Sequence, residues 1–273
     1  MIKTGIKLEL YRAFHNFYYL LALLLGCAIA ILHFVMQVIP KTRCIGVFQN
    51  IDYPYSVFNS CLPLDMGCFH LYLFYFAVIL LGTIPFGMSY YTDLREGYIK
   101  NIYTRMEHNG YLIGKYLAVF LSAGSVCVIP LCLNIALTMA VLPSLIPQQG
   151  TAMFALAGSC MLSGLFYSHP FAYLGVYLII DFTITGLFAC MGLVVAKIIY
   201  NRYVVLFTPF VLFFVMQTVF MYTPIASAGP YYIMNPCQQQ WQQTPIVITE
   251  IVLLFLVSFG TFYLMGGKKH DTL

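Results

Sequence analysis

The residues best placed for chemistry lie in one compact block, YYTDLREGYIKNIYTRMEHNGYLIGK at positions 90–115, between two long apolar runs. The chain has 13 basic and 9 acidic residues, and seven of these charges fall in this block. The charged residues of the block are Asp93, Arg95, Glu96, Lys100, Arg105, Glu107 and Lys115. Such a concentration of charge in an apolar chain indicates a segment that contacts water or another protein.

The sequence offers no catalytic constellation. It lacks the G-x-S-x-G and H-E-x-x-H motifs, and no Cys/His cluster has metal-ligand spacing. The fragment GYLIGK at 110–115 resembles a phosphate-binding loop, but it is one residue short, and Tyr116 stands where Ser or Thr would bind magnesium. We therefore expect no catalytic residue, no metal site, no cofactor and no ATPase activity in this chain.

Four polar residues lie inside apolar stretches and are candidates for a pathway through the protein: Asp181, Asn134, Gln217 and Glu250. Ionisable residues within a membrane are costly and often functional. Asp181 either lines a polar cavity or joins helices through a hydrogen bond. Glu250 lies nearer an interface, where it either lines the pathway or extends to the headgroups.

The elements that must position these residues are membrane spans. Of the 273 residues, 61% are hydrophobic and 8% are charged, whereas soluble domains carry about 25% charged residues. Six stretches approach the roughly 20 apolar residues of a span, namely 17–38, 69–90, 112–142, 171–199, 204–222 and 245–265. The apolar segment 152–167 is short, and we expect an interfacial or re-entrant helix there rather than a seventh span.

The basic residues predict the orientation. With six spans and a cytosolic N-terminus, only Lys41 and Arg43 of the 13 basic residues fall outside. This predicts an all-α protein of the plasma membrane with both termini cytosolic. Residues 1–16 have an amphipathic pattern and are not a secretory signal, so they form either an interfacial helix or the polar start of the first span. Residues 17–273 form the transmembrane domain, without a nucleotide-binding domain.

The expected outer loops are 39–68, 143–170 and 224–244. The first contains Cys44, Cys61 and Cys68. Outside the cytoplasmic membrane these cysteines allow one disulfide, Cys44–Cys61 or Cys44–Cys68, with one thiol left over. The alternative is that all three are reduced.

The charged block falls in the main cytosolic loop, 91–112. Asp93 can cap a helix with Glu96 three residues on, and Glu96 pairs with Lys100 one turn later. Apolar residues at 99, 102, 103 and 106 form a stripe on the same helix. The pattern predicts a helix over 93–107 whose stripe packs on lipid, on the spans or on another protein.

The order D-x-R-E-G-x-x-K, followed by Arg105 and then by Gly114–Lys115 at the start of a span, resembles the first intracellular loop of ABC-2 type permeases. These are the membrane subunits of one class of ATP-binding cassette transporters. The resemblance implies the type-2 ABC exporter fold, with an elbow helix, six spans and a coupling helix. The residues that would couple to the ATPase are Asp93, Arg95, Glu96, Gly97, Lys100, Tyr103 and Arg105.

The resemblance also implies partners. A separate cytosolic ATPase subunit would bind ATP and magnesium, and a second permease chain would complete a homodimer. A hydrophobic or amphipathic cargo is expected, such as a bacterial peptide toxin or bacteriocin, and no nucleic acid. The alternatives are export of lipids or small hydrophobic drugs, and proton-coupled secondary transport through Asp181 and Glu250.

Overall fold

The computed structural model describes residues 2–43, 55–99, 108–149, 156 and 160–268. Over these residues the chain is helical and contains no strand, which confirms the all-α prediction. The longer helices are α1 (Ile2–Phe14), α2 (Phe17–His33), α5 (Phe69–Thr83), α6 (Ser89–Arg95), α8 (His108–Val141), α10 (Pro170–Ile198), α11 (Arg202–Met221), α13 (Thr244–Phe255) and α14 (Thr261–Lys268). The short elements are η1 (Phe34–Val38), α3 (Ile39–Arg43), α4 (Val57–Ser60), η2 (Leu62–Leu64), α9 (Ser163–Ser168), η3 (Ala226–Ala228), α12 (Pro230–Met234) and η4 (Leu256–Gly260).

Local sequence signals fix where several helices begin. The side chains of Asn16 and Asn201 accept the backbone N–H of Tyr18 and Tyr203, and so cap α2 and α11. Proline stands at the first turn of α10 and of α13, where its missing N–H has no partner to lose. These signals give each long apolar run a defined start.

Among the described residues, five helical segments are long and apolar enough to cross a membrane: Phe17–Arg43, Asn109–Val141, Pro170–Ile198, Arg202–Met221 and Thr244–Leu264. The protein is therefore a multi-pass membrane protein, as its composition predicts. The first segment continues through η1 and α3 and ends five residues beyond the predicted limit of the span at 38.

The expected span 69–90 is not one continuous helix, and whether it crosses the membrane stays a prediction. Helix α5 ends at Thr83 after 15 residues, and residues 84–88 form a turn before α6. Pro85 has no N–H to continue the ladder, which explains the break. At 1.5 Å per residue α5 alone is about 22 Å long, shorter than the roughly 30 Å of a hydrocarbon core.

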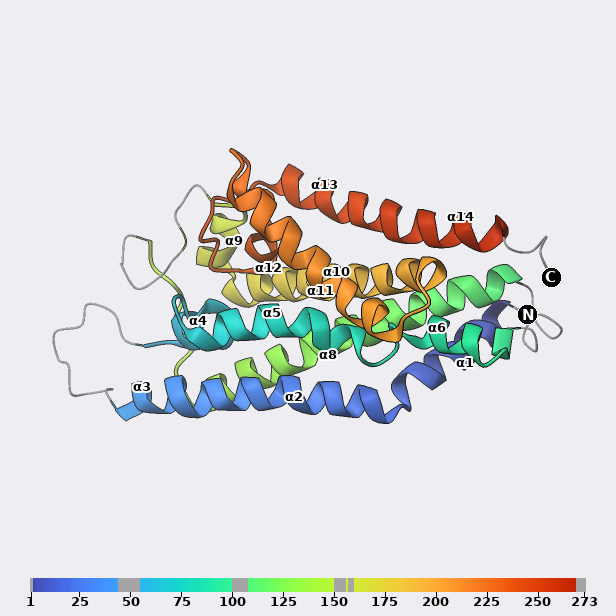
Figure 1. Ribbon diagram of the computed structural model, residues 1–273. Helices are drawn as coiled ribbons and strands as arrows, with labels where there is room; N and C mark the ends of the chain where they lie inside the picture. The colour runs from blue at the N-terminus through green and yellow to red at the C-terminus, as the bar shows by residue number, and fades with distance from the viewer. Residues whose placement is uncertain (1, 44–54, 100–107, 150–155, 157–159, 269–273) are drawn as a thin grey trace.

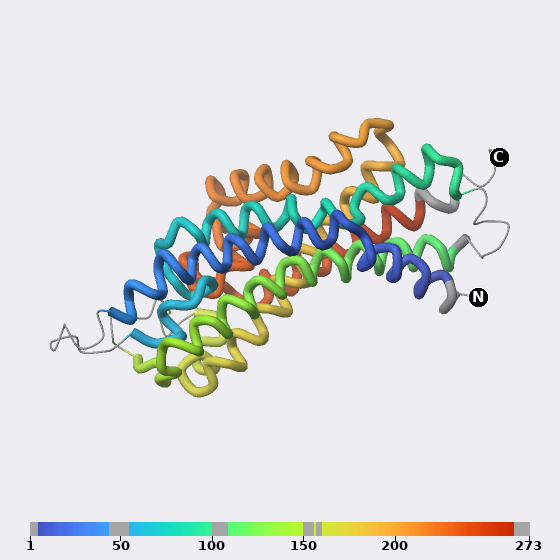
Figure 2. The backbone as a smooth tube through the Cα atoms, turned by 90° about the horizontal axis from the view of Figure 1, so that it is seen from below, coloured from blue at the N-terminus to red at the C-terminus, as the bar shows by residue number. Residues whose placement is uncertain are grey.

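The bundle is built around α8 and α10, which run side by side along its length (Figures 1 and 2). Two phenylalanines lock them together. The ring of Phe120 on α8 covers Gly186 of α10, and the ring of Phe182 on α10 covers Gly124 of α8. A Cβ at either glycine would come within 2.6 Å of the facing ring, so only glycine allows this approach.

The remaining helices surround this pair. Helices α1, α2 and α5 contact α8, while α5, α11 and α13 contact α10. In the most apolar window of each helix, 67% of α10 is buried but only 22% of the first segment and of α11. The apolar faces of these outer helices are therefore available to lipid.

The two ends of the bundle differ. Helices α1, α6 and α14 lie at one end, and α3, α4, α9 and α12 lie at the other (Figure 1). Of the apolar segment 152–167, the structure describes only residue 156 and the part from 160 onward, where α9 begins at Ser163. No spanning helix lies in this described part.

Candidate functional site

Four charged side chains meet at the crossing of α1, α6 and α8: Glu9, Arg12, Asp93 and Lys115, hereafter the charge cluster. The Lys115 ammonium donates to Asp93 Oδ2 over 2.5 Å and to Glu9 Oε2 over 2.9 Å. Arg12 donates to Glu9 Oε1 over 2.9 Å and to Asp93 Oδ1 over 2.8 Å. Each acid thus faces both bases, and the cluster is electrically balanced.

The cluster is almost entirely withdrawn from solvent. The side chains of Glu9 and Lys115 are fully buried, that of Asp93 is 2% exposed, and only Arg12 reaches the surface at 32%. Tyr111 donates a further hydrogen bond to Asp93 Oδ2 over 2.7 Å. The Lys115 ammonium lies 4.5 Å from the ring centre of Phe86. Breaking a pair in such surroundings leaves a buried charge and is strongly destabilising.

The environment of Asp93 shifts its titration. Burial by itself raises the pKa of the carboxyl group, but the charge of Lys115 and the hydrogen bonds from Arg12, Lys115 and Tyr111 outweigh it. The pKa of Asp93 therefore lies below its ordinary value, and the group is ionised at neutral pH.

A glycine allows these helices to meet. A Cβ on Gly114 of α8 would lie 3.2 Å from Cα and 3.3 Å from the nitrogen of Ile6 on α1. The absence of a side chain therefore lets α1 lie directly on α8, with Lys115 beside Glu9. The Gly114–Lys115 pair of the sequence motif builds this contact.

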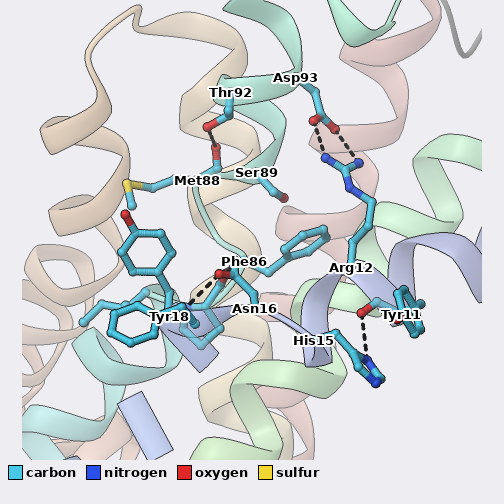
Figure 3. Close-up of a pocket in the computed structure, with 13 residues that line it drawn as sticks. Tyr11, Arg12, His15, Asn16, Tyr18, Phe86, Met88, Ser89, Thr92 and Asp93 are labelled. Atoms are coloured by element: carbon cyan, nitrogen blue, oxygen red, sulfur yellow. Dashed lines mark hydrogen bonds and ion pairs between the residues drawn. The ribbon is translucent and has the colours of Figure 1, made fainter. Parts of the chain in front are cut away.

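A cavity of about 450 Å³ lies beside the cluster, between the α1–α2 junction and the α5–α6 turn (Figure 3). Arg12 and Asp93 form part of its wall, together with His15 and Ser89. Asn16 closes one side by donating to the carbonyl oxygen of Pro85 over 3.2 Å. The end of α1 is therefore tied to the turn that precedes α6.

The predicted coupling residues take different positions. Asp93 is not an N-cap as expected, because it lies inside α6 and its carboxylate faces α1 and α8. The helix expected over 93–107 is interrupted at its start. Helix α6 ends at Arg95, and Gly97 has the left-handed φ of +69° that suits glycine after a helix end. Arg95 and Glu96 are exposed, whereas Lys100, Tyr103 and Arg105 lie outside the described residues.

Sequence reasoning missed Glu9 and Arg12. Their spacing of three residues on a helix, with opposite charges, was a signal for a pair. The partner Lys115 is 106 residues from Glu9, and no local pattern connects them. Residues 2–14 do form a helix, α1, as expected for the N-terminal segment.

The four intramembrane candidates are not brought together. Asn134 lies toward the end of the bundle that carries α3 and α4, where its Nδ2 donates to the Ala30 carbonyl and its Oδ1 accepts the Leu62 N–H. Gln217 accepts the N–H of Tyr231, at the start of α12, over 3.0 Å. Both residues fasten segments of this end to the bundle.

The carboxyl groups of Asp181 and Glu250 lack some or all of their hydrogen-bond partners among the described residues. Asp181 accepts a hydrogen bond of 3.3 Å from Tyr75 at one oxygen, and its other oxygen has no partner among the described residues. Glu250 lies on α13 beside an apolar pocket, and neither of its oxygens has a partner there. Asp181 thus joins helices, while Glu250 is left facing a cavity.

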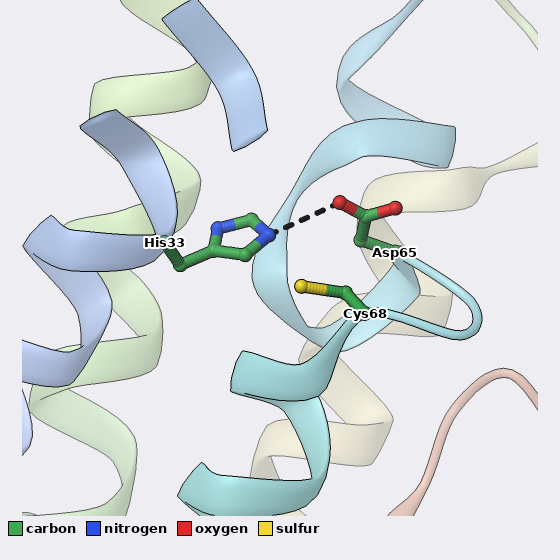
Figure 4. A group of neighbouring side chains, drawn as sticks. All are labelled: His33, Asp65 and Cys68. Carbon is green, nitrogen blue, oxygen red and sulfur yellow. Dashed lines mark hydrogen bonds and ion pairs between the residues drawn. The ribbon is translucent and has the colours of Figure 1, made fainter. Parts of the chain in front are cut away.

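A group with metal-ligand chemistry lies near the end of the bundle that carries α3 and α4: His33, Asp65 and Cys68, whose ligand atoms all fall within 4.8 Å of one another (Figure 4). Its hydrogen bonds argue against a metal. Asn134 Nδ2 donates to His33 Nδ1, so the ring proton lies on Nε2 and points at Asp65 over 3.2 Å. The same Asp65 oxygen also binds the Lys41 ammonium over 2.9 Å. Both His33 nitrogens and one Asp65 oxygen thus already have partners in the chain, and Cys68 Sγ lies 3.4 Å from His70 Nδ1.

The predicted disulfide involves Cys44, which lies outside the described residues. Cys61 and Cys68 are buried thiols that are not joined to each other. Either pairing with Cys44 therefore stays a prediction.

Comparisons with known proteins add no relative to this picture. No family model matches the chain, and no curated protein and no solved structure matches it either.

Proposed function

We propose that this chain is the membrane permease subunit of an ATP-driven exporter of the ABC-2 type. Two copies would form the pathway, and a separate cytosolic ATPase would dock on the segment around 93–107. The cargo would be hydrophobic or amphipathic, such as a bacterial peptide toxin. The resemblance of the 93–115 block to the coupling loop of that family supports the assignment.

The observation that carries the proposal is the charge cluster. An ATPase that pulls on a short cytosolic segment moves the spans only if the segment is rigidly attached to them. Asp93 provides such an attachment, because it is paired with Arg12 of α1 and with Lys115 of α8. A displacement at Arg95 and Glu96 would therefore be transmitted to two helices at once. An ATP-driven conformational change also requires that the inward- and outward-facing states differ in their contacts. The ion pairs of the charge cluster are contacts that could differ between these two states.

The topology of the proposal follows from the charges and the fold together. Helix α1 would be the elbow helix at the cytosolic interface. The span needed in addition to the five long helices would be the second along the chain, made of α5, the turn at 84–88 and α6. Helices α1, α6 and α14 lie at the same end of the bundle, which supports a cytosolic position for both termini in the plasma membrane.

Co-purification tests the proposal. A tagged candidate ATPase subunit with Walker A and LSGGQ motifs should be retained by the wild-type chain and lost on Glu96→Lys, which reverses an exposed charge at the end of α6. Arg202→Glu is the matched control, because Arg202 is an exposed charge at the start of α11, outside the segment. Retention of the ATPase and of ATP-dependent transport by Glu96→Lys and by a deletion of 97–105 would overturn the proposal.

A second candidate is a proton-coupled transporter, favoured by the two buried carboxyl groups without full partners, Asp181 and Glu250. Uptake or efflux driven by a pH gradient in vesicles without ATP, and abolished by Asp181→Asn, would support this alternative over the first.

A further inference from the structure

A pocket of about 510 Å³ lies between α10, α11 and α13, separate from the charge cluster. Phe188 and Met191 of α10 form its floor and are buried, and Met216 and Phe220 come from α11. The only acidic or basic residue among those that line it is Glu250 of α13. The pocket is thus an apolar chamber with one carboxyl group.

Glu250 has no hydrogen-bond partner in the part of the chain that the structure describes. The residue is 7% exposed, and neither carboxylate oxygen makes a hydrogen bond among the described residues. The neighbouring hydroxyl of Thr249 donates instead to the carbonyl oxygen of Pro245. A buried carboxylate without a partner is costly, so the free energy of a positively charged group entering the pocket would be favourable.

The pocket is open at one side. Leu212 of α11, Leu253 of α13 and Val257 of η4 line it and are 38%, 56% and 50% exposed. These side chains lie on the faces of helices that are available to lipid. A hydrophobic molecule dissolved in the bilayer can therefore approach Glu250 without crossing an aqueous region.

The lining selects among ligand classes. A metal ion needs several oxygen or nitrogen ligands, and the pocket offers one carboxyl group. An anion would be repelled, and a neutral hydrophobe would leave the carboxylate unpaired. An organic cation with a large apolar body matches both the charge and the apolar lining of the pocket. Its charge pairs with Glu250, while the rings of Phe188 and Phe220 and the thioethers of Met191 and Met216 cover its body.

We propose that this pocket is a binding site for lipophilic organic cations, with Glu250 as the counter-ion. Binding itself requires no ATPase and no second chain. Only the further step, that such a cation is the exported cargo, rests on the proposed function.

The experiment uses two probes of the same shape and opposite charge, tetraphenylphosphonium and tetraphenylborate, and the purified full chain in detergent micelles. Protein-dependent, saturable binding is measured by equilibrium dialysis against empty micelles. The wild-type chain is expected to bind the cation and not the anion. Glu250→Gln, which keeps the shape of the side chain, should weaken cation binding by roughly 30-fold or more, the loss expected when one partner of a buried charge pair is removed.

Two further variants separate the pocket from the fold. Asp181→Asn removes a buried carboxyl group that does not line the pocket, and it should leave cation affinity unchanged. Met216→Trp should fill the pocket and abolish binding with Glu250 still present. Equal binding of cation and anion, undiminished binding by Glu250→Gln, or no binding by the wild-type chain would each overturn the inference. Such an outcome would leave the ATPase co-purification result unaffected, so the two proposals fail separately.

Discussion

Lys115 on α8 donates to Asp93 on α6 over 2.5 Å, although the two residues are 22 positions apart and on opposite sides of the charged loop. Both belong to the motif that resembles a coupling loop. The ion pair closes the base of this loop, and Glu9 and Arg12 of α1 complete it. The motif thus has a structural role that is independent of any partner chain.

Removal of the central cation should destabilise the fold. Lys115→Met leaves Glu9 and Asp93 with Arg12 alone, so the free energy of unfolding should fall by about 3–5 kcal/mol. Thermal and denaturant unfolding of the purified chain in detergent measure this loss. Lys7→Met, which removes an exposed lysine from the same helix as Glu9, should change stability by no more than about 0.5 kcal/mol. Equal free energies of unfolding for the two variants would show that the charge cluster does not stabilise the fold.

The low pKa of Asp93 predicts loss of stability in acid. A carboxyl group with a depressed pKa in the folded state stabilises the protein above its unfolded pKa of about 3.9. That contribution is lost as the pH falls through the lower folded value. As the pH falls from 7, the wild-type chain should therefore keep its stability advantage over Asp93→Asn down to about pH 5 and lose it progressively at lower pH. Parallel pH profiles of the two chains would contradict this.

The close approach of α1 and α8 makes Gly114 intolerant of a side chain. Gly114→Leu should push α1 off α8 and lower the free energy of unfolding by about 1–3 kcal/mol. Gly175→Leu on α10 is the control, because a Cβ there meets nothing within 4 Å. Unfolding of the two variants under identical conditions compares them, and a Gly114 variant as stable as the control would show that the contact is not tight.

Asn134 should hold the segment around Cys61 and Leu62 against the bundle. Asn134→Leu leaves the Leu62 N–H and the Ala30 carbonyl without their side-chain partners, a loss of about 1–3 kcal/mol. Burial raises the pKa of the neighbouring Cys61 thiol to about 12, so this thiol should react slowly with maleimides in the wild-type chain.

The variant should expose Cys61 and increase its labelling rate about tenfold or more, the factor that corresponds to roughly 1.4 kcal/mol. Mass spectrometry can assign the label to this cysteine. Thr218→Val is the control, because Thr218 is exposed and bonds only to a carbonyl of its own helix. Unchanged labelling in Asn134→Leu would show that this residue does not hold the segment.

Sequence patterns located most helices because hydrophobic length and caps are local properties. The apolar runs at 112–142, 171–199, 204–222 and 245–265 correspond to spanning helices within a few residues. The run 69–90 is interrupted at 84–88, a break that hydropathy cannot predict because it does not register the missing N–H of Pro85. The predicted cap at Asp93 failed for a different reason. An aspartate that could cap a helix can equally form ion pairs, and here the Asp93 carboxylate pairs with Arg12 and Lys115, which are distant in sequence.

An all-helical, multi-pass membrane chain follows from composition, because 61% hydrophobic and 8% charged residues cannot cover a soluble domain. The residue pattern also marks Asp93, Lys115 and Glu250 as functional candidates. Their contacts follow from the folded structure alone. Glu9 and Lys115 pair across 106 residues, and Glu250 faces a chamber made by three helices. Such contacts depend on how helices pack, and packing depends on shape across the bundle rather than on any local pattern.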